Sequence, residues 1–179
     1  MTSDAPHAAV MLPTVVLLVD DQPIIAAAVQ RMLASQPEWQ LHYCQDPASA
    51  VAKAIELRPT CILQDLVMPG TDGLELVSRY RAEPTLRETP LVVLSSKEEP
   101  ETKAKAFALG ANDYLVKLPD PVEVVARIRH HSDGYKALQE RNAAYAALAA
   151  SERHLQEEAR RAAEYVRSLL PPTLDRKST

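Results

Sequence analysis

Short, mostly apolar runs recur along the first two thirds of the chain, and each is followed by a segment whose apolar residues have helical spacing. Runs of valine, isoleucine and leucine are typical of strands that are buried on both faces of a sheet. The pattern predicts five strands, over residues 15–19, 40–44, 61–64, 91–94 and 113–116. It also predicts a helix after each strand, the fifth of them beginning at Pro121. Pro69-Gly70 with Asp72-Gly73 predicts a loop, in which Asp72-Gly73 makes a turn and caps the next helix. His130-His131 is interpreted as a solvated helix end.

Strands that alternate with helices through short connections indicate a series of right-handed βαβ units. Such units form one parallel sheet with helices on both faces. We therefore predict an α/β protein with a flavodoxin-like (βα)5 doubly wound sheet in the strand order 2-1-3-4-5. This domain is expected over residues 14–131, after an N-terminal tail of residues 1–13.

A second apolar stripe begins beyond Gly134 and has the alternating spacing of three and four residues that is typical of coiled coils. Its members are Leu138, Tyr145, Leu148, Leu155, Ala159, Ala162, Val166 and Leu169, with Arg141 and Glu152 as polar interruptions. We predict an extended signalling helix over 132–170 that forms a parallel dimeric coiled coil; the alternative is a helix packed on its own domain. Gly134 would cost about 1 kcal/mol within a helix and marks a candidate joint.

Residues 171–179 begin with Pro171-Pro172 and are interpreted as a truncated linker to an absent output domain.

Composition and charge narrow the class of protein further. The 179 residues are 46% hydrophobic, which suits one packed domain with an appendage. A net charge of -4 without a local cluster of Lys and Arg argues against a nucleic-acid surface. No basic leader and no run near the roughly 18 apolar residues of a membrane span occurs, so we expect a cytoplasmic protein without a membrane segment. Cys44 and Cys61 lie in strand-like runs and are interpreted as core residues.

Chemically distinctive residues stand where the predicted strands end. Asp20 and Asp21 follow the first strand, Asp65 the third, Ser95 the fourth and Lys117 the fifth. The carboxyl ends of parallel strands meet at one edge of the sheet, so these side chains should converge on one cleft. Three carboxylates placed together repel one another, and a divalent cation would relieve that repulsion. Oxygen ligands without His or Cys favour Mg²⁺, or Mn²⁺.

Such a site suits transfer of a phosphoryl group to a carboxylate. The cation and Lys117 would neutralise the phosphoryl oxygens, and the Ser95 hydroxyl would donate a hydrogen bond to one of them. Asp65 would be the nucleophile.

These residues, together with Met68-Pro69-Gly70, Asp72-Gly73 and the run 110–114, resemble the response-regulator receiver family of two-component systems. The resemblance covers residues 14 to about 131. It implies that Asp65 accepts a phosphoryl group from a histidine kinase or phosphotransfer protein. It also implies a switch formed by Ser95 and Tyr114, and a metal site formed by Asp20, Asp21, Asp65 and the backbone carbonyl of Val67. Leu118 separates Lys117 from Pro119, whereas most of the family has Pro directly after that Lys.

Two shorter segments resemble parts of larger signalling proteins. Residues 95–100 and 117–120 are similar to receivers that precede diguanylate cyclases, and residues 164–172 are similar to the lead-in to PP2C-like serine phosphatase domains. Either enzyme could therefore be the missing output domain.

We interpret the chain as a switch, not an enzyme, beyond Mg²⁺-dependent self-phosphorylation and self-dephosphorylation. A homodimer is expected through the C-terminal helix, or through the face formed by the fourth helix, the fifth strand and the fifth helix, or through both. The alternative is a Mg²⁺-dependent phosphohydrolase of the aspartyl-phosphate type, which uses the same kinds of residue.

Overall fold

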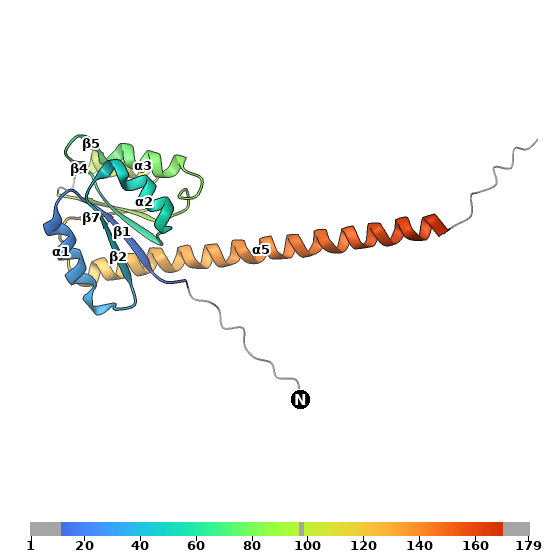
Figure 1. Cartoon of the computed structure of the whole chain (residues 1–179). Coiled ribbons are helices and arrows are strands. Elements are labelled where there is room, and N and C mark those ends of the chain that lie inside the picture. Colours follow the sequence, from blue (N-terminus) through green and yellow to red (C-terminus); the bar gives the residue numbers. More distant parts are fainter. Residues whose placement is uncertain (1–11, 97–98, 170–179) are drawn as a thin grey trace, which may run out of the picture. The chain divides into compact units, whose positions relative to one another are not determined.

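A five-stranded parallel sheet organises the computed structural model, which describes residues 12–96 and 99–169. Its strands are β1 (Val15–Val19), β2 (Gln40–Cys44), β3 (Cys61–Asp65), β6 (Leu91–Ser95) and β7 (Asp113–Val116). Their spatial order is β2-β1-β3-β6-β7. Figure 1 labels β1, β2 and β7 of this sheet. Counted along the chain, this is the order 2-1-3-4-5 of the five sheet strands, so the predicted fold is confirmed.

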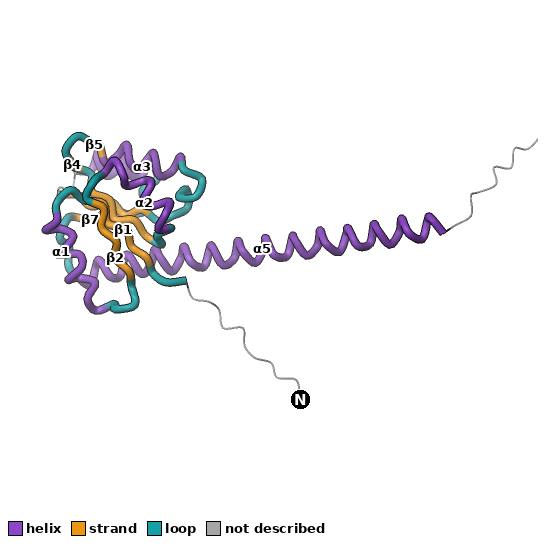
Figure 2. The backbone as a smooth tube through the Cα atoms, viewed as in Figure 1, coloured by secondary structure: helices purple, strands orange, loops and turns teal. Residues whose placement is uncertain are grey.

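Helices cover both faces of this sheet, as the tube in Figure 2 shows. They are α1 (Pro23–Met32), α2 (Ala50–Leu57), α3 (Gly73–Ala82), α4 (Pro100–Ala108) and α5 (Pro121–Leu169), with short 3-10 turns η1 (Leu33–Ser35) and η2 (Pro47–Ser49). One core cluster joins the sheet to α1, η1 and the first turns of α5, and the other joins it to α2, α3 and α4. Neighbouring residues of β1 divide between them, because Leu17 belongs to one cluster and Leu18 to the other. Burial on both faces explains why the strand runs are continuously apolar.

The segment after β3, which the sequence predicted as a loop, contains a small antiparallel pair. It consists of β4 (Val67–Met68) and β5 (Thr71–Asp72). Pro69 and Gly70 form the turn between them, and Gly70 has a φ of 72°. Proline followed by a residue with positive φ is the sequence of a type II turn. The Asp72 side chain accepts a hydrogen bond from the Leu74 N–H and caps α3, as predicted.

A partly buried arginine at the end of α3 holds two loops together, the α3–β6 loop and the α4–β7 loop. The Arg81 guanidinium donates to the Gly110 carbonyl at 2.9 Å, the Thr89 carbonyl at 2.8 Å and the Asn112 side-chain oxygen at 2.7 Å. That same oxygen accepts from the backbone N–H of Leu91 at 2.8 Å. The run 110–114 thus has a structural role beyond its resemblance to the family, since it joins the α4–β7 loop to the start of β6.

We expect Arg81→Lys to lower the free energy of unfolding by about 2 kcal/mol, because an ammonium cannot reproduce the planar fork and would leave partly buried acceptors unpaired. Arg79→Lys is the matched control, since Arg79 lies two residues away and its replacement leaves these contacts in place. Urea denaturation of both variants measures the difference. Equal stabilities would contradict the role given to the Arg81 fork.

Polar contacts as well as apolar ones attach the first turns of α5 to the sheet. The buried Ser132 hydroxyl accepts a hydrogen bond from Thr60 at 3.0 Å. The Asp113 carboxylate, at the start of β7, accepts from Arg127 and lies 3.0 Å from His131 Nε2. The interpretation that His131 belongs to a solvated helix end is therefore wrong, because the sequence does not reveal its partner 18 residues earlier.

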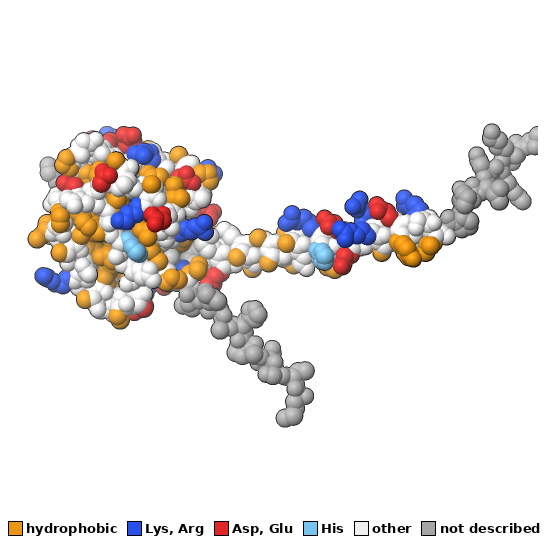
Figure 3. Space-filling model, viewed as in Figure 1, with side chains coloured by type: hydrophobic (Ala, Val, Ile, Leu, Met, Phe, Trp, Pro, Cys, Tyr) orange, Lys and Arg blue, Asp and Glu red, His pale blue; other side chains and the backbone are white. Residues whose placement is uncertain are grey.

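The chain divides into two compact units between Ala137 and Leu138, whereas the sequence placed the boundary after residue 131. Helix α5 continues through Gly134, so the candidate joint does not interrupt it. Within the second unit the large apolar side chains of the helix are exposed, and Figure 3 shows such side chains beside Lys, Arg, Asp and Glu. The exposed ones are Tyr145, Leu148, Leu155, Tyr165, Val166 and Leu169.

Candidate functional site

Parallel pairing brings the ends of four strands to the same edge of the sheet. Val19 is paired with Gln64, Asp65 with Leu94, and Ser95 with Val116. The residues at or directly after these ends are therefore neighbours in space. They are Asp20, Asp21, Asp65, Ser95 and Lys117.

Three carboxylates form the centre of this edge. Asp20, Asp21 and Asp65 each offer one oxygen, and these three oxygens lie within 4.8 Å of one another. Asp20 and Asp65 are fully buried, and Asp21 is half-buried. The hairpin residue Val67 lies beside them, since its backbone N–H donates to Asp65 Oδ1 at 3.1 Å.

Two of the carboxylate oxygens are buried without a hydrogen bond from the described residues. They are Oδ1 of Asp21 and Oδ2 of Asp20, and the second has only an ion pair with the Lys117 ammonium, 3.0 Å away. An unpaired buried carboxylate oxygen costs free energy, and a cation is the group that would satisfy it. A donor set of carboxylate oxygens suits Mg²⁺ or Mn²⁺. The residues present therefore fit the expected metal.

The Lys117 side chain places a positive charge beside the carboxylates at this edge. Its Nζ lies 2.7 Å from Asp65 Oδ2 and 3.0 Å from Asp20 Oδ2, and its side chain is only 9% exposed. The Lys117 backbone N–H donates to the Ser95 carbonyl at 2.7 Å, which fixes where the side chain starts. The next residue, Leu118, has a left-handed backbone with a φ of 56°. The inserted leucine thus gives the loop after β7 a conformation that costs a non-glycine residue about 1 kcal/mol.

Burial and neighbouring charges shift the pKa values of both Asp65 and Lys117. Burial raises the pKa of Asp65, and the Asp20 charge adds to this, although hydrogen bonds from Lys117 and Val67 partly offset it. Burial lowers the pKa of Lys117, but hydrogen bonds and charge from Asp65 and Asp20 outweigh it, so the net pKa is raised. Lys117 is therefore a permanent cation at neutral pH, and a further cation would favour the ionised form of Asp65.

A small hollow opens next to the carboxylates. It has a volume of about 310 Å³ and is lined by Leu66, Val67, Ser95, Ser96, Glu99 and Thr102. Ser95 is buried at the end of β6, whereas the neighbouring Ser96 is exposed. The hollow has room for a phosphoryl group between the acidic cluster and the first turn of α4.

Tyr114 lies inside the protein, three residues before Lys117. It is 6% exposed and belongs to the core cluster on the face of α2, α3 and α4. The Lys103 Nζ lies over its ring, 5.5 Å from the ring centroid.

Gly73 supports the site in a way that the sequence did not reveal. A Cβ at this position would lie 2.5 Å from the Asp65 carbonyl oxygen and 2.5 Å from the Leu66 Cα. The start of α3 therefore presses directly on the backbone that carries Asp65. A turn with a helix cap was the interpretation of Asp72-Gly73, and the close approach depends on contacts that the local sequence does not show.

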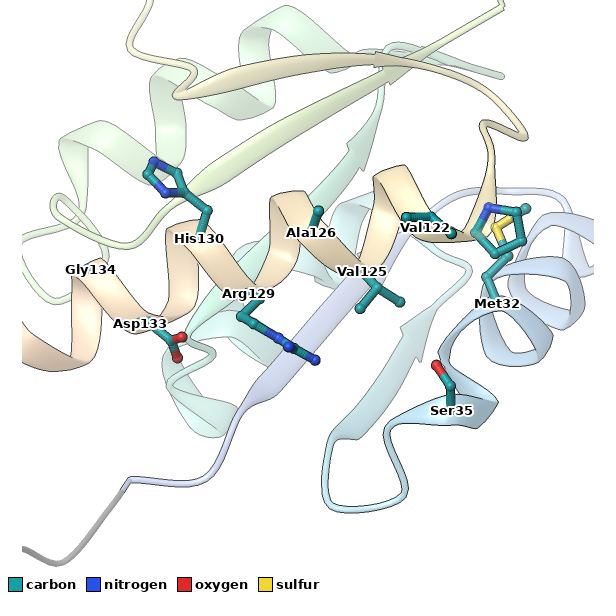
Figure 4. A pocket seen from close by; sticks show the side chains of 10 residues that line it. Met32, Ser35, Val122, Val125, Ala126, Arg129, His130, Asp133 and Gly134 are labelled. Atoms are coloured by element: carbon teal, nitrogen blue, oxygen red, sulfur yellow. The ribbon is translucent and has the colours of Figure 1, made fainter.

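A larger hollow lies elsewhere, between α1, η1 and α5, and has a volume of about 790 Å³. Figure 4 shows Val122, Val125 and Arg129 on α5 and, from the opposite wall, Met32 and Ser35. None of the predicted site residues lines it. It is therefore separate from the acidic cluster.

Comparison with known proteins agrees with this geometry. A family model described as the response regulator receiver domain matches residues 16–129. The transcriptional regulatory protein ResD of Bacillus subtilis is 34% identical over 116 residues, which are 65% of this chain and 47% of ResD. The chain thus spans about half the length of the curated relatives it matches.

Solved structures give the same result. The chemotaxis protein CheY4 of Vibrio cholerae is 29% identical with a TM-score of 0.62, and the match covers 66% of this chain and 98% of CheY4. The Mn²⁺-bound form of the response regulator Rcp1 is 28% identical with a TM-score of 0.55, over 66% of this chain and 91% of Rcp1.

These findings decide between the two functions that the sequence left open. The phosphohydrolase alternative is not supported, because the matches are to response regulators. Among the described residues, no helix is both long and apolar enough to span a membrane. The matching segment contains the whole acidic edge of the sheet, from Asp20 to Lys117. The chain belongs to the response regulator receiver domain family of two-component systems.

Proposed function

We propose that Asp65 is the phospho-acceptor of this receiver and that a histidine kinase or phosphotransfer protein is the donor. The observation that carries the proposal is the position of the Lys117 ammonium, which lies within 3.0 Å of both Asp65 and Asp20. A cation held against the acceptor carboxylate can attract a phosphoryl group to it and balance its charge.

In the proposed transfer, Asp65 attacks the phosphorus of a phosphohistidine. A new O–P bond forms, the P–N bond breaks, and its electron pair returns to the imidazole of the donor. Lys117 and the Ser95 hydroxyl contact the phosphoryl oxygens. Asp20, Asp21, Asp65 and the Val67 carbonyl would hold Mg²⁺ or Mn²⁺, which when bound neutralises charge on those oxygens. The Mn²⁺-bound form of the similar protein Rcp1 supports this choice of ion.

Phosphorylation is proposed to act through the hydroxyl of Ser95 and the ring of Tyr114. If Ser95 moves toward the phosphoryl group, the buried position of Tyr114 next to β6 is favoured. Such a change would alter the surface formed by α4, β7 and α5. Phe107 of α4 and Val116 of β7 are exposed and apolar, which supports a role of this surface in recognition.

A homodimer is the proposed assembly, through that surface, through the helix stripe of residues 138–169, or through both. The heptad spacing of exposed apolar residues supports the helix as a parallel coiled coil.

A serine phosphatase or a diguanylate cyclase remains the proposed output. ResD is a transcriptional regulatory protein, and the match covers less than half of it, so the absence of nucleic-acid binding stays a prediction for this chain. The cytoplasmic location also stays a prediction.

The test is phosphorylation by acetyl phosphate, followed by intact mass and light scattering. We expect one phosphoryl group per chain in Mg²⁺ or Mn²⁺, none in EDTA, and a larger assembly in the phosphorylated sample. Free phosphate is measured in parallel, because a phosphohydrolase would release many phosphates per chain and retain none. Mass gain that does not depend on a divalent cation would contradict the proposed site, and an unchanged assembly would contradict the proposed dimer.

A further inference from the structure

One contact joins helix α4 to the strand that leads to Lys117. Lys103 lies on the exposed side of α4, but its ammonium reaches back over the ring of Tyr114, 5.5 Å from the centroid. The face of an aromatic ring carries partial negative charge, so a cation in this position is attracted to it. The exposed Lys103 thus contacts a residue that is itself buried, since Tyr114 is only 6% exposed.

The position of this contact connects it to the candidate phosphorylation site. Tyr114 is paired with Val93, two residues before Ser95 in β6. On the helix side, Thr102 adjoins Lys103 in sequence and lines the hollow with Ser95. The buried Ala106 of α4 belongs to the same core cluster as Tyr114. Displacing the ring would therefore disturb the wall that α4 contributes to the hollow.

We propose that Lys103 is a positioning residue for the phosphoryl site. Its ammonium holds the Tyr114 ring in the buried position and thereby holds the first turns of α4 beside Ser95. Lys103 does not touch the phosphoryl group; it acts through Tyr114. This inference rests on the proposed function, in which the buried position of Tyr114 accompanies phosphorylation.

A second lysine on the same helix provides a matched control. Lys105 is also exposed, and it lines a different hollow with Leu74, Glu75 and Ser78 of α3. It makes no contact of this kind with a ring among the described residues. Replacing it removes the same charge from α4 without removing the contact with Tyr114.

The experiment measures the affinity of the full chain for beryllofluoride, a mimic of the phosphoryl group, by calorimetry in saturating Mg²⁺. Lys103→Met keeps an unbranched apolar chain but removes the charge, and it should bind about two- to fivefold more weakly, the range for an exposed cation–π contact. Lys103→Arg should restore most of the affinity, since a guanidinium also stacks on rings. Lys105→Met should bind as the unaltered chain does.

A double-mutant cycle with Tyr114→Leu separates this role from a general effect of charge on α4. Once the ring is absent, Lys103→Met should cause no further loss of affinity. Unchanged affinity in Lys103→Met alone, or the same loss with and without the ring, would overturn the inference while leaving Asp65 as the acceptor. If the unaltered chain bound no beryllofluoride, the proposed function would fail, and this inference with it.

Discussion

The Asp65→Asn variant is expected to gain no phosphoryl group from acetyl phosphate under conditions in which the unaltered chain gains one. An amide oxygen is a poor nucleophile, and the change also removes one of the three carboxylates that would hold the metal. Intact mass measures the first effect. Calorimetric titration with Mg²⁺ measures the second, for which we expect at least about a tenfold loss of affinity, as for loss of a supporting metal contact.

The fold should survive this substitution. The introduced amide oxygen can still accept the hydrogen bond that Val67 now donates to Asp65. The amide NH2 cannot accept from Lys117 as Oδ2 does, but Lys117 keeps Asp20 as a partner at 3.0 Å. The raised pKa of Asp65 also means that its ionised form is unfavourable in the fold, so a neutral amide should not lower the free energy of unfolding at pH 7. The direction of this effect follows from linkage. A carboxyl group whose pKa is higher in the folded state than in the unfolded state stabilises the fold only as the pH falls toward that pKa.

Asp72→Asn is the matched control for Asp65→Asn. Asp72 lies seven residues further along the chain, is exposed, and caps α3, a position that asparagine fills equally well. This variant should be phosphorylated normally. A phosphoryl group on the Asp65→Asn chain, or its loss from the Asp72→Asn chain, would contradict the assignment of Asp65.

Gly73→Ala is expected to reduce both stability and phosphorylation. The added Cβ would lie 2.5 Å from backbone atoms of Asp65 and Leu66, and backbone cannot rotate away as a flexible side chain can. Either α3 or the end of β3 must shift, and overpacking of this kind costs roughly 3 kcal/mol. Urea denaturation should show that loss, and the rate of phosphorylation should fall because the acceptor carboxylate moves with its backbone.

The control for this prediction is the same substitution at Gly134. Apart from the adjoining backbone of α5 itself, no described atom lies within 4 Å of a Cβ at that position. Alanine there should raise the free energy of unfolding by roughly 0.5–1 kcal/mol, because glycine is a poor helix former. A Gly73→Ala chain as stable as the unaltered one would show that the start of α3 can move freely relative to Asp65.

Much of the candidate site could be predicted because its residues stand at strand ends. Once the runs before Asp20, Asp65, Ser95 and Lys117 are read as parallel strands, topology alone brings their last residues to one edge. The alternation of strands and helices indicated a parallel sheet, and the order 2-1-3-4-5 was predicted because it is common among such sheets. The hairpin after β3 was not expected, because its strands are only two residues long and carry no measurable periodicity.

The contacts that support the site could not be predicted in the same way. Each of these contacts joins two different elements of the fold. They are Gly73 against Asp65, Lys103 over Tyr114, and Arg81 with Asn112. A local pattern shows that a residue is glycine, lysine or arginine, but it does not show what lies opposite. The partner of His131 was missed for the same reason.

The spacing of apolar residues predicts the strands and the heptad stripe, and the residue at each strand end predicts the acidic edge, because a parallel sheet places those ends side by side. The distances between backbones, the pairing of charges and the burial of rings are known only from the folded chain. Those properties depend on packing between elements far apart in the chain, where small differences in distance separate a contact from a clash.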